Sequence, residues 1–224
     1  MRGVVVDIDG TLTDDSRRMS LEAVAALRTV EDSGVSVMLA SGNVLPIAYA
    51  VSTYMGFGGP IIAENGGVVC HRQRVWELGD DERPREAWEL LRRELPGVER
   101  LFTDRWRETE IGLKQGVDLG LVRELLRPMQ VDVQTTGWAV HIMNKGMDKF
   151  VGVTKACEIM GLDVDRVAAI GDSENDIRMI EGCGWGIAIG NADERTRSAA
   201  SYVARKSNGD GVIEGLKWLR LLRE

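Results

Sequence analysis

The 224-residue chain has few of the side chains on which several common kinds of site depend. Its two histidines, His71 and His141, leave little material for a histidine metal cluster or a serine triad, so we expect structural roles for both. Its three cysteines, Cys70, Cys157 and Cys183, lie far apart and form no C-x-x-C pair. Neither a disulfide framework nor a thiolate zinc site is therefore indicated, and we expect buried, reduced thiols.

Long apolar runs and an excess of positive charge are also missing. No apolar run reaches about 18 residues, which argues against a membrane span. The first residues pass directly into the apolar run at 4–6, which leaves no room for a signal peptide, so we expect a cytoplasmic protein. The formal net charge of −7 argues against a nucleic-acid partner, because affinity for a phosphate backbone depends on clustered lysine and arginine.

The composition is that of an ordinary globular protein. Hydrophobic residues make up 44% of the chain and charged residues 28%, which argues against disorder. A chain of 224 residues can bury a real hydrophobic core, as one large domain or as a core with a smaller domain, and length alone does not separate these two cases.

The stretch from Val4 to Asp14 is the most informative part of the chain. The β-branched run Val4 to Val6 predicts a buried strand that ends at Asp7, and Asp9 follows two residues later. Side chains two apart in an extended backbone point to the same side, so we expect the two carboxylates to converge on one cation, most plausibly Mg²⁺. The alternative is a buried strand that ends in an acidic turn.

Together with the first strand, the next residues predict a βαβ unit, in which a helix connects two parallel strands. Apolar residues at helical spacing predict a helix at 20–32 with Ser20 as its N-cap, and residues 35–43 predict a second buried strand. A crossover of this kind makes the sheet parallel, so both polar strand ends lie at its carboxyl edge, where open α/β sheets bind ligands. Ser41 then has two compatible interpretations, an N-cap for a helix at 45–54 or a phosphate ligand together with Gly42.

The middle of the chain changes character near residue 80. Residues 60–67 predict a short strand with an Asn-Gly turn, and 68–78 predict one hairpin strand. Beyond them the order is a charged helix at 80–97, one or two strands at 101–115, a helix at 118–128 and two strands at 131–143. This repeated pattern indicates an inserted α+β domain at 80–144, between core segments 1–79 and 145–224.

A second acidic motif follows the insert. Residues 167–170 predict a buried strand, Gly171 a turn, and Asp172 stands at the strand end. If a helix begins near Glu174, Asp172 and Asp176 can face one cation; the alternative is an ordinary Ser173 cap before an acidic first turn. A strand and turn at 186–192, a short helix at 193–200, an edge strand at 201–204 and an amphipathic helix at 208–224 complete the expected core.

Two of these motifs carry a resemblance to a known family. The string DIDGT at 7–11 resembles the first motif of the haloacid dehalogenase (HAD) superfamily, whose members are mostly phosphatases with an aspartate nucleophile. GDSEND at 171–176 is similar to the fourth motif, G-D-x-x-N-D, and Ser41 matches the second. Asn43 departs from the T-G-R that relatives with a large cap often carry. The fold implied is α/β, a Rossmann-like parallel-sheet core with a small inserted α+β cap.

The resemblance also implies roles for individual residues. Lys149 would be the lysine that opens the helix after the cap, in preference to Lys145, and Asn65 of an E-N-G element is a candidate for substrate contact. Mg²⁺ is the implied cofactor, with the backbone carbonyl of Asp9 among its ligands. The implied sets are the catalytic residues Asp7 and Asp9, the phosphate or substrate ligands Ser41, Gly42, Lys149 and Asn175, and the metal ligands Asp7, Asp9, Asp172 and Asp176.

The place of the cap implies the kind of substrate. An insert between the second and third motifs resembles the C2B type of the Cof-like subfamily IIB, here near the minimal α-β-β-α-β-β form. The pattern is most similar to archaeal phosphoglycolate phosphatases, which implies hydrolysis of a small phosphomonoester, 2-phosphoglycolate first. A broad sugar-phosphate phosphatase, a phosphomutase and a non-catalytic binding module stay open, as does oligomeric state. Arg105, Arg107 and Lys114 are candidate cations for the substrate carboxylate, although we expect each at the surface.

Overall fold

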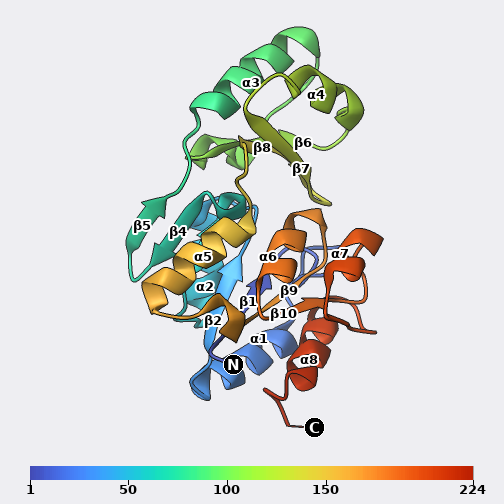
Figure 1. The fold of residues 1–224 in the computed structure, drawn as a ribbon. Helices are drawn as coiled ribbons and strands as arrows, with labels where there is room; N and C mark the ends of the chain where they lie inside the picture. The colour runs from blue at the N-terminus through green and yellow to red at the C-terminus, as the bar shows by residue number, and fades with distance from the viewer. Residues whose placement is uncertain (224) are drawn as a thin grey trace.

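The computed structural model describes residues 1–223, and Figure 1 shows a larger and a smaller part, each built around a sheet of its own. The larger sheet has eight strands in the order β11-β10-β9-β1-β2-β3-β4-β5, and the smaller has three in the order β6-β8-β7. The expected α/β fold with a mostly parallel sheet is confirmed. Within the described residues no helix has both the length and the apolar character that a membrane span requires.

The centre of the large sheet is formed by three parallel strands. Strand β1 (Gly3–Asp7) pairs with β2 (Ser36–Ala40) on one side and with β9 (Val167–Gly171) on the other. Asp7 lies opposite Ala40 in register, and Gly171 ends β9 directly before the second acidic motif. The polar strand ends therefore share one edge of the sheet, as the crossover pattern predicts.

Helices cover both faces because successive residues of β1 point in opposite directions. Val4 and Val6 pack in a cluster with side chains of α1 and α8, whereas Val5 packs with side chains of α5 and α6. All three valines are fully buried. The core helices are α1 (Leu21–Asp32), α2 (Leu45–Met55), α5 (Lys149–Met160), α6 (Ile177–Gly182), α7 (Glu194–Ala199) and α8 (Asn208–Trp218), and the remaining parallel strands are β10 (Trp185–Ala188) and β11 (Tyr202–Val203).

Two of the expected elements end earlier than the sequence pattern indicates. The helix expected at 208–224 ends at Trp218, and Arg220 beyond it has a φ of 59° that no α-helix accommodates. Residue 224 lies outside the described residues. The strand expected at 68–78 is two strands, β4 (Val68–His71) and β5 (Arg74–Glu77), because Arg72 and Gln73 both adopt the positive φ of a tight hairpin turn.

The short strand β3 (Ile61–Ala63) pairs in parallel with β2. A 3-10 turn, η1 (Glu64–Gly66), then connects β3 to β4, its antiparallel partner. Gly66 has a φ of 101°, and a Cβ built on it would lie 2.0 Å from the carbonyl oxygen of Asp148. The turn therefore passes directly against the residue before α5, the helix that begins with Lys149. Only glycine fits this approach.

The cap contains α3 (Glu82–Glu94), a 3-10 helix η2 (Phe102–Trp106), β6 (Glu110–Lys114), α4 (Leu119–Leu126), β7 (Val131–Thr135) and β8 (Ala139–Asn144). Its hydrophobic cluster draws only on residues between 87 and 142 and includes Leu91, Ile111 and Ile142. The cap thus has a core of its own beside the large sheet (Figure 1). The boundaries at 79/80 and 144/145 stay a prediction.

The cap has one strand at 101–115, where the sequence pattern allows one or two, so its sheet has one strand fewer than the α-β-β-α-β-β form. The 3-10 helix η2 takes the place of the missing strand, of which only a single bridge between Arg100 and Leu113 remains. The buried Asp104 side chain explains the difference: it pairs with Arg100 and accepts from the backbone N–H of Gly112 at 2.5 Å. This side chain competes with a continuous backbone ladder.

We predict that Gly66→Ala lowers the free energy of unfolding by about 1–3 kcal/mol more than Gly97→Ala. Gly97 is a matched control because its φ is 94° and a Cβ there meets nothing within 4 Å. Both variants carry the strain of alanine at positive φ, so their difference isolates the contact with Asp148. Urea unfolding measures it, and equal midpoints would contradict this account of the turn.

Candidate active site

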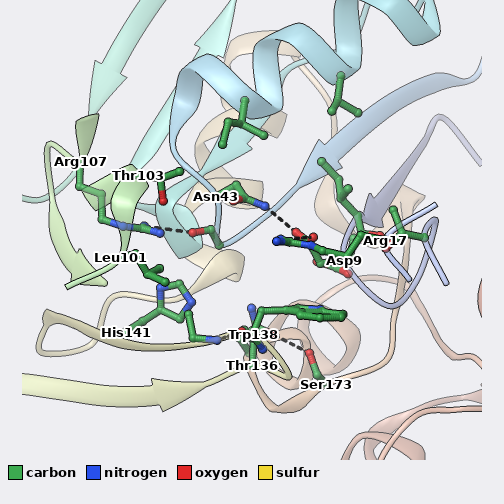
Figure 2. A pocket seen from close by; sticks show the side chains of 18 of the residues that line it. Asp9, Arg17, Asn43, Leu101, Thr103, Arg107, Thr136, Trp138, His141 and Ser173 are labelled. Atoms are coloured by element: carbon green, nitrogen blue, oxygen red, sulfur yellow. Dashed lines mark hydrogen bonds and ion pairs between the residues drawn. The ribbon is translucent and has the colours of Figure 1, made fainter. Parts of the chain in front are cut away.

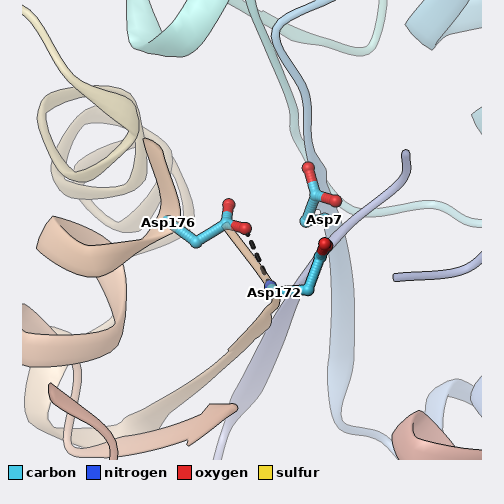
Figure 3. Close-up of side chains that lie close together, drawn as sticks. All are labelled: Asp7, Asp172 and Asp176. Carbon is cyan, nitrogen blue, oxygen red and sulfur yellow. Dashed lines mark hydrogen bonds between the residues drawn. The ribbon is translucent and has the colours of Figure 1, made fainter. Parts of the chain in front are cut away.

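Three carboxylates from two neighbouring strand ends meet at the edge of the large sheet. Asp7 is the last residue of β1, Asp172 follows β9, and Asp176 ends the short 3-10 helix η4 (Glu174–Asp176). One oxygen of each carboxylate lies within 4.8 Å of the others (Figure 3). The structure therefore brings together the three side chains that the sequence motifs indicate as ligands of one cation.

Asp176 is fixed from two sides. Its Oδ2 accepts hydrogen bonds from the backbone N–H groups of Asp172 and Ser173 at 3.0 and 3.1 Å. Its Oδ1 accepts from Lys149 Nζ at 2.6 Å. The expected helical turn near Glu174 is present, and it aims the Asp176 carboxylate back at the strand end.

Lys149 lies between two of the carboxylates and is fully buried. Its Nζ donates to Asp7 Oδ1 and to Asp176 Oδ1, both at 2.6 Å. Burial opposes the charge, but the attraction of Asp176 and Asp7 outweighs it and raises the pKa of Lys149. The structure thus brings Lys149 to the site and leaves Lys145 exposed.

The negative charge of the cluster is only partly compensated. Burial, with the repulsion of Asp176 and Asp172, raises the pKa of Asp7 well above its ordinary value, although Lys149 counteracts this. Burial and Asp176 raise the pKa of Asp172 to about 7, even though Oδ1 of Asp172 accepts from the Thr11 hydroxyl at 2.6 Å. Asp7 Oδ2 is buried without any hydrogen-bond partner among the described residues.

These features fit a bound divalent cation. The donor set consists of carboxylate oxygens, which Mg²⁺ prefers, and the orphaned Asp7 Oδ2 is a ligand atom without another partner. Gly10 has a φ of 91°, and a Cβ on it would lie 2.7 Å from Asp172 Oδ2. The Asp172 carboxylate therefore fits beside the turn after β1 only when residue 10 is glycine.

The carboxylate of Asp9 does not join the cluster, which corrects the expectation that Asp7 and Asp9 converge. Asp9 Oδ2 accepts from Asn43 Nδ2 at 2.5 Å, and Oδ1 pairs with Arg17 at 2.9 Å (Figure 2). The reason is that β1 ends at Asp7, so the alternation of an extended strand does not reach Asp9. The role of the Asp9 backbone carbonyl as a metal ligand stays a prediction.

The second motif forms a turn that is not a helix cap. Ser41 is fully buried, and its hydroxyl accepts from the backbone N–H of Asn43 at 3.0 Å. Helix α2 has Val44 as its N-cap with no side-chain hydrogen bond, so the interpretation of Ser41 as an N-cap is wrong. Binding of phosphate by Ser41 and Gly42 stays a prediction. Asn43, the departure from T-G-R, holds Asp9 instead.

Two asparagines connect the fourth motif to the cap. Asn175 Nδ2 donates to Asn65 Oδ1, and Asn65 Nδ2 donates to Glu110 Oε2 of β6, each at 2.9 Å. Asn175 lines the cavity described below, whereas Asn65 is fully buried and does not. The structure therefore gives Asn65 a bridging position between core and cap, and its contact with a substrate stays a prediction.

Glu64, the residue before Asn65, holds the cap by its backbone. Its carboxylate accepts from the backbone N–H groups of Glu108 and Thr109 and from the Thr109 hydroxyl, at 2.9 to 3.2 Å. Burial raises the pKa of Glu64, and the bonds to Thr109 counteract it. The E-N-G element thus connects the core to the cap through hydrogen bonds.

A cavity of about 480 Å³ lies between the core and the cap (Figure 2). Asp7, Asp9 and Asn175 line it from the core, and Trp138 and Leu101 line it from the cap. Its walls are otherwise largely apolar; they include Ile8, Met19, Ile47, Val51, Phe102 and Ala139. The reactive edge of the sheet therefore opens into a space that the cap covers.

Two arginines in the cavity wall were not identified correctly from the sequence. Arg107, expected at the surface, has a side chain only 2% exposed; it pairs with Glu110, and its Nη1 donates to the carbonyl of Gly42 at 3.0 Å. No sequence pattern indicates that Arg17 lines the cavity, because it lies in the irregular loop after β1. Arg105 and Lys114 lie at the surface, as expected.

His141 has a structural place in the same wall. Its Nδ1 lies 3.0 Å from Glu110 Oε1, and it is 3% exposed. Burial, with the nearby positive charges of Arg107 and Lys149, lowers the pKa of His141 well below its ordinary value. The ring is therefore neutral near pH 7 and adds no charge to the cavity.

The comparison with known proteins follows the same residues. A family model described as haloacid dehalogenase-like hydrolase matches residues 4–87 and 124–216. The chain belongs to this family. The unmatched residues 88–123 lie in the cap and include the candidate cations Arg105, Arg107 and Lys114, whereas the matched segments contain all the predicted catalytic, phosphate-binding and metal-binding residues.

Similar proteins match the HAD-like hydrolase from end to end. A phosphoglycolate phosphatase of Methanothermobacter thermautotrophicus is 42% identical, covering 97% of this chain and 98% of the relative, and one of Archaeoglobus fulgidus is 38% identical, covering 99% and 98%. A solved structure from Thermoplasma acidophilum has a TM-score of 0.92 at 29% identity, covering 99% of each chain. A HAD subclass IIB sugar phosphatase, with a TM-score of 0.84 at 17% identity and 99% and 100% coverage, supports the fold alone. The family resemblance seen in the motifs is confirmed.

We predict that Lys149→Met lowers the free energy of unfolding by about 3–5 kcal/mol in EDTA at pH 7, because Asp7 and Asp176 lose the cation between them. The control is Lys155→Met on the same helix, whose partner Glu158 is at the surface; its cost should stay below about 1 kcal/mol. Urea unfolding decides, and similar losses for both variants would contradict the paired arrangement.

We also predict a pH dependence of stability that Asp172→Asn reduces. A carboxyl group whose pKa is raised to about 7 on folding binds protons more tightly in the native state, so metal-free protein should lose stability as pH rises from about 4 to 7. In EDTA, Asp172→Asn should flatten this slope. Asp15→Asn, at an exposed position outside the cluster, should keep it; unfolding in urea across this range measures both.

Proposed function

We propose that this protein is a Mg²⁺-dependent phosphomonoesterase that hydrolyses 2-phosphoglycolate to glycolate and phosphate through an aspartyl-phosphate. The observation that carries the proposal is the buried Asp7 carboxylate, held by Lys149 at one oxygen and without a partner at the other. The substrate comes from the phosphoglycolate phosphatases that match the full chain at 42% and 38% identity.

The reaction would proceed in two displacements at phosphorus. A carboxylate oxygen of Asp7 attacks phosphorus, the bond from phosphorus to the glycolate oxygen breaks, and Asp9 gives that oxygen a proton. In the second step Asp9 takes a proton from water, the water oxygen attacks phosphorus, and Asp7 leaves as a carboxylate with release of phosphate. Asn43 orients the Asp9 carboxylate for both transfers.

The charge of the phosphoryl group would be balanced from both sides. Lys149 binds a phosphoryl oxygen, and Ser41, Gly42 and Asn175 supply hydroxyl, backbone and amide donors at the same edge. The carboxylates of Asp7, Asp172 and Asp176 and the carbonyl of Asp9 would hold Mg²⁺, which would supply the positive charge that phosphoryl transfer requires.

The size of the cavity favours a second candidate, a broader sugar-phosphate phosphatase. At about 30 Å³ per water molecule, 480 Å³ holds on the order of 15 waters, more room than a two-carbon acid fills. We further propose a cytoplasmic location, because Cys70, Cys157 and Cys183 are buried free thiols that suit a reducing compartment.

We predict that wild-type protein releases phosphate from 2-phosphoglycolate faster than from a panel of sugar phosphates, and only with Mg²⁺. Asp7→Asn should reduce the rate at least about a thousandfold, because the amide is not a nucleophile. Asp15→Asn should behave as wild type. A preference for sugar phosphates would select the second candidate, and release that persists in EDTA or in Asp7→Asn would contradict the mechanism.

A further inference from the structure

The positive charge of the cavity comes from two side chains. Among the described residues that line it, only Arg17 and Arg107 are charged cations, since His141 is neutral. We propose that Arg17 binds the carboxylate of the leaving group and thereby selects phosphomonoesters of small hydroxy acids. This inference rests on the proposed function and adds the residue that sets its specificity.

Arg107 is already committed to the protein. Its Nη1 pairs with the buried Glu110 and donates to the Gly42 carbonyl, and its Nε, 3.8 Å from Asp104 Oδ1, is buried and makes no hydrogen bond within the described residues. A substrate carboxylate that took this guanidinium would leave Glu110 buried without its cation, which costs several kcal/mol. Asp104 and Glu110 already face Arg107, so this arginine forms part of the cavity wall and has less charge to offer a ligand than Arg17.

Arg17 has its donors free for a ligand. Its side chain is 51% exposed, and its one ion pair, to Asp9 Oδ1, uses a single Nη2. The other N–H groups of the guanidinium make no hydrogen bond within residues 1–223. A planar guanidinium with free donors is suited to bidentate binding of a carboxylate.

The cap holds the Arg17 guanidinium in place. Its Cζ lies 4.8 Å from the centre of the Trp138 ring, which covers it from the opposite side of the cavity (Figure 2). This cation–π contact favours the positive charge without consuming an N–H donor. Arg17 therefore contacts core and cap at once, at the mouth of the space that a substrate would enter.

The place of Arg17 matches the geometry of the substrate. Asp9 is the residue that exchanges a proton with the leaving oxygen, so that oxygen must come within hydrogen-bond reach of it. In 2-phosphoglycolate one methylene carbon separates the leaving oxygen from the carboxylate. A guanidinium 2.9 Å from Asp9 is thus within reach of the carboxylate, which would replace Asp9 as its partner.

The loop that carries Arg17 is built to direct it inward. Asp14 Oδ1 accepts from the backbone N–H groups of Ser16 and Arg18 at 2.9 Å each, and the Arg17 N–H donates to the Asp14 carbonyl at 2.8 Å. Arg17 itself has a φ of 61°, unusual for a residue with a side chain. Its neighbour Arg18 does not line the cavity.

Calorimetric titration in the Asp7→Asn background, with Mg²⁺, tests the inference apart from turnover. The ligands are 2-phosphoglycolate and 2-hydroxyethyl phosphate, which has a neutral hydroxyl in place of the carboxylate. We expect Asp7→Asn protein to prefer 2-phosphoglycolate, and Arg17→Ala to reduce the ratio of the two affinities about ten- to hundredfold. Arg17→Lys should restore part of the preference, and Arg18→Ala should leave it unchanged.

Each outcome decides the inference. An unchanged ratio in Arg17→Ala, or equal binding of both ligands before that substitution, would overturn it; the first result would direct attention to Arg107. Equal weakening of both ligands would also overturn it, since Arg17 would then act on the site as a whole. The proposed function stands or falls separately, on phosphate release by the protein that retains Asp7.

Discussion

The structure depends on the repulsion among three carboxylates that two strand ends force together, and on the one lysine that offsets it. Two unit charges 4 Å apart interact by about 4 kcal/mol at an effective dielectric constant of 20, a large part of the stability of a domain. The backbone at the adjoining strand ends places Asp7, Asp172 and Asp176 close together, and their carboxylates therefore repel one another. Lys149 offsets this repulsion by pairing with Asp7 and Asp176. The turn at Gly66 packs against Asp148, the residue before Lys149, and so helps to position the start of α5.

Much of the core could be predicted because its signals are local in the sequence. The valine run of β1 indicates a buried strand, Ser20 caps α1 as expected, and the acidic residues at the strand ends follow from the parallel order of the sheet. Lys149, at the start of α5 and in the cluster, was expected only from the resemblance to the family. Periodicity and chain order are enough wherever a residue's position follows from its own strand or helix.

The rest could not be predicted because it depends on contacts between segments that no local pattern connects. Arg17 lines the cavity through an irregular loop, and Trp138 reaches it from a turn of the cap. Arg107 is buried because it forms an ion pair with Glu110 and donates a hydrogen bond to the Gly42 carbonyl. The missing cap strand also depends on one side-chain contact. The Asp104 side chain accepts the hydrogen bond of the Gly112 N–H, which a neighbouring strand would otherwise take, and strand propensity does not account for such a competition.

The order of the strands has a consequence for how the protein is made. Lys149 and Asp7 are 142 residues apart in the chain, and Thr11 and Asp172 are 161 apart. On the ribosome β1 leaves first, and its partner β9 follows only after the whole cap, whose three strands pair with one another between residues 110 and 144. The cap can thus complete its own packing while one edge of the first strand is still open. The newborn chain therefore carries Asp7 long before it carries Lys149, Asp172 and Asp176, the charged side chains that surround it.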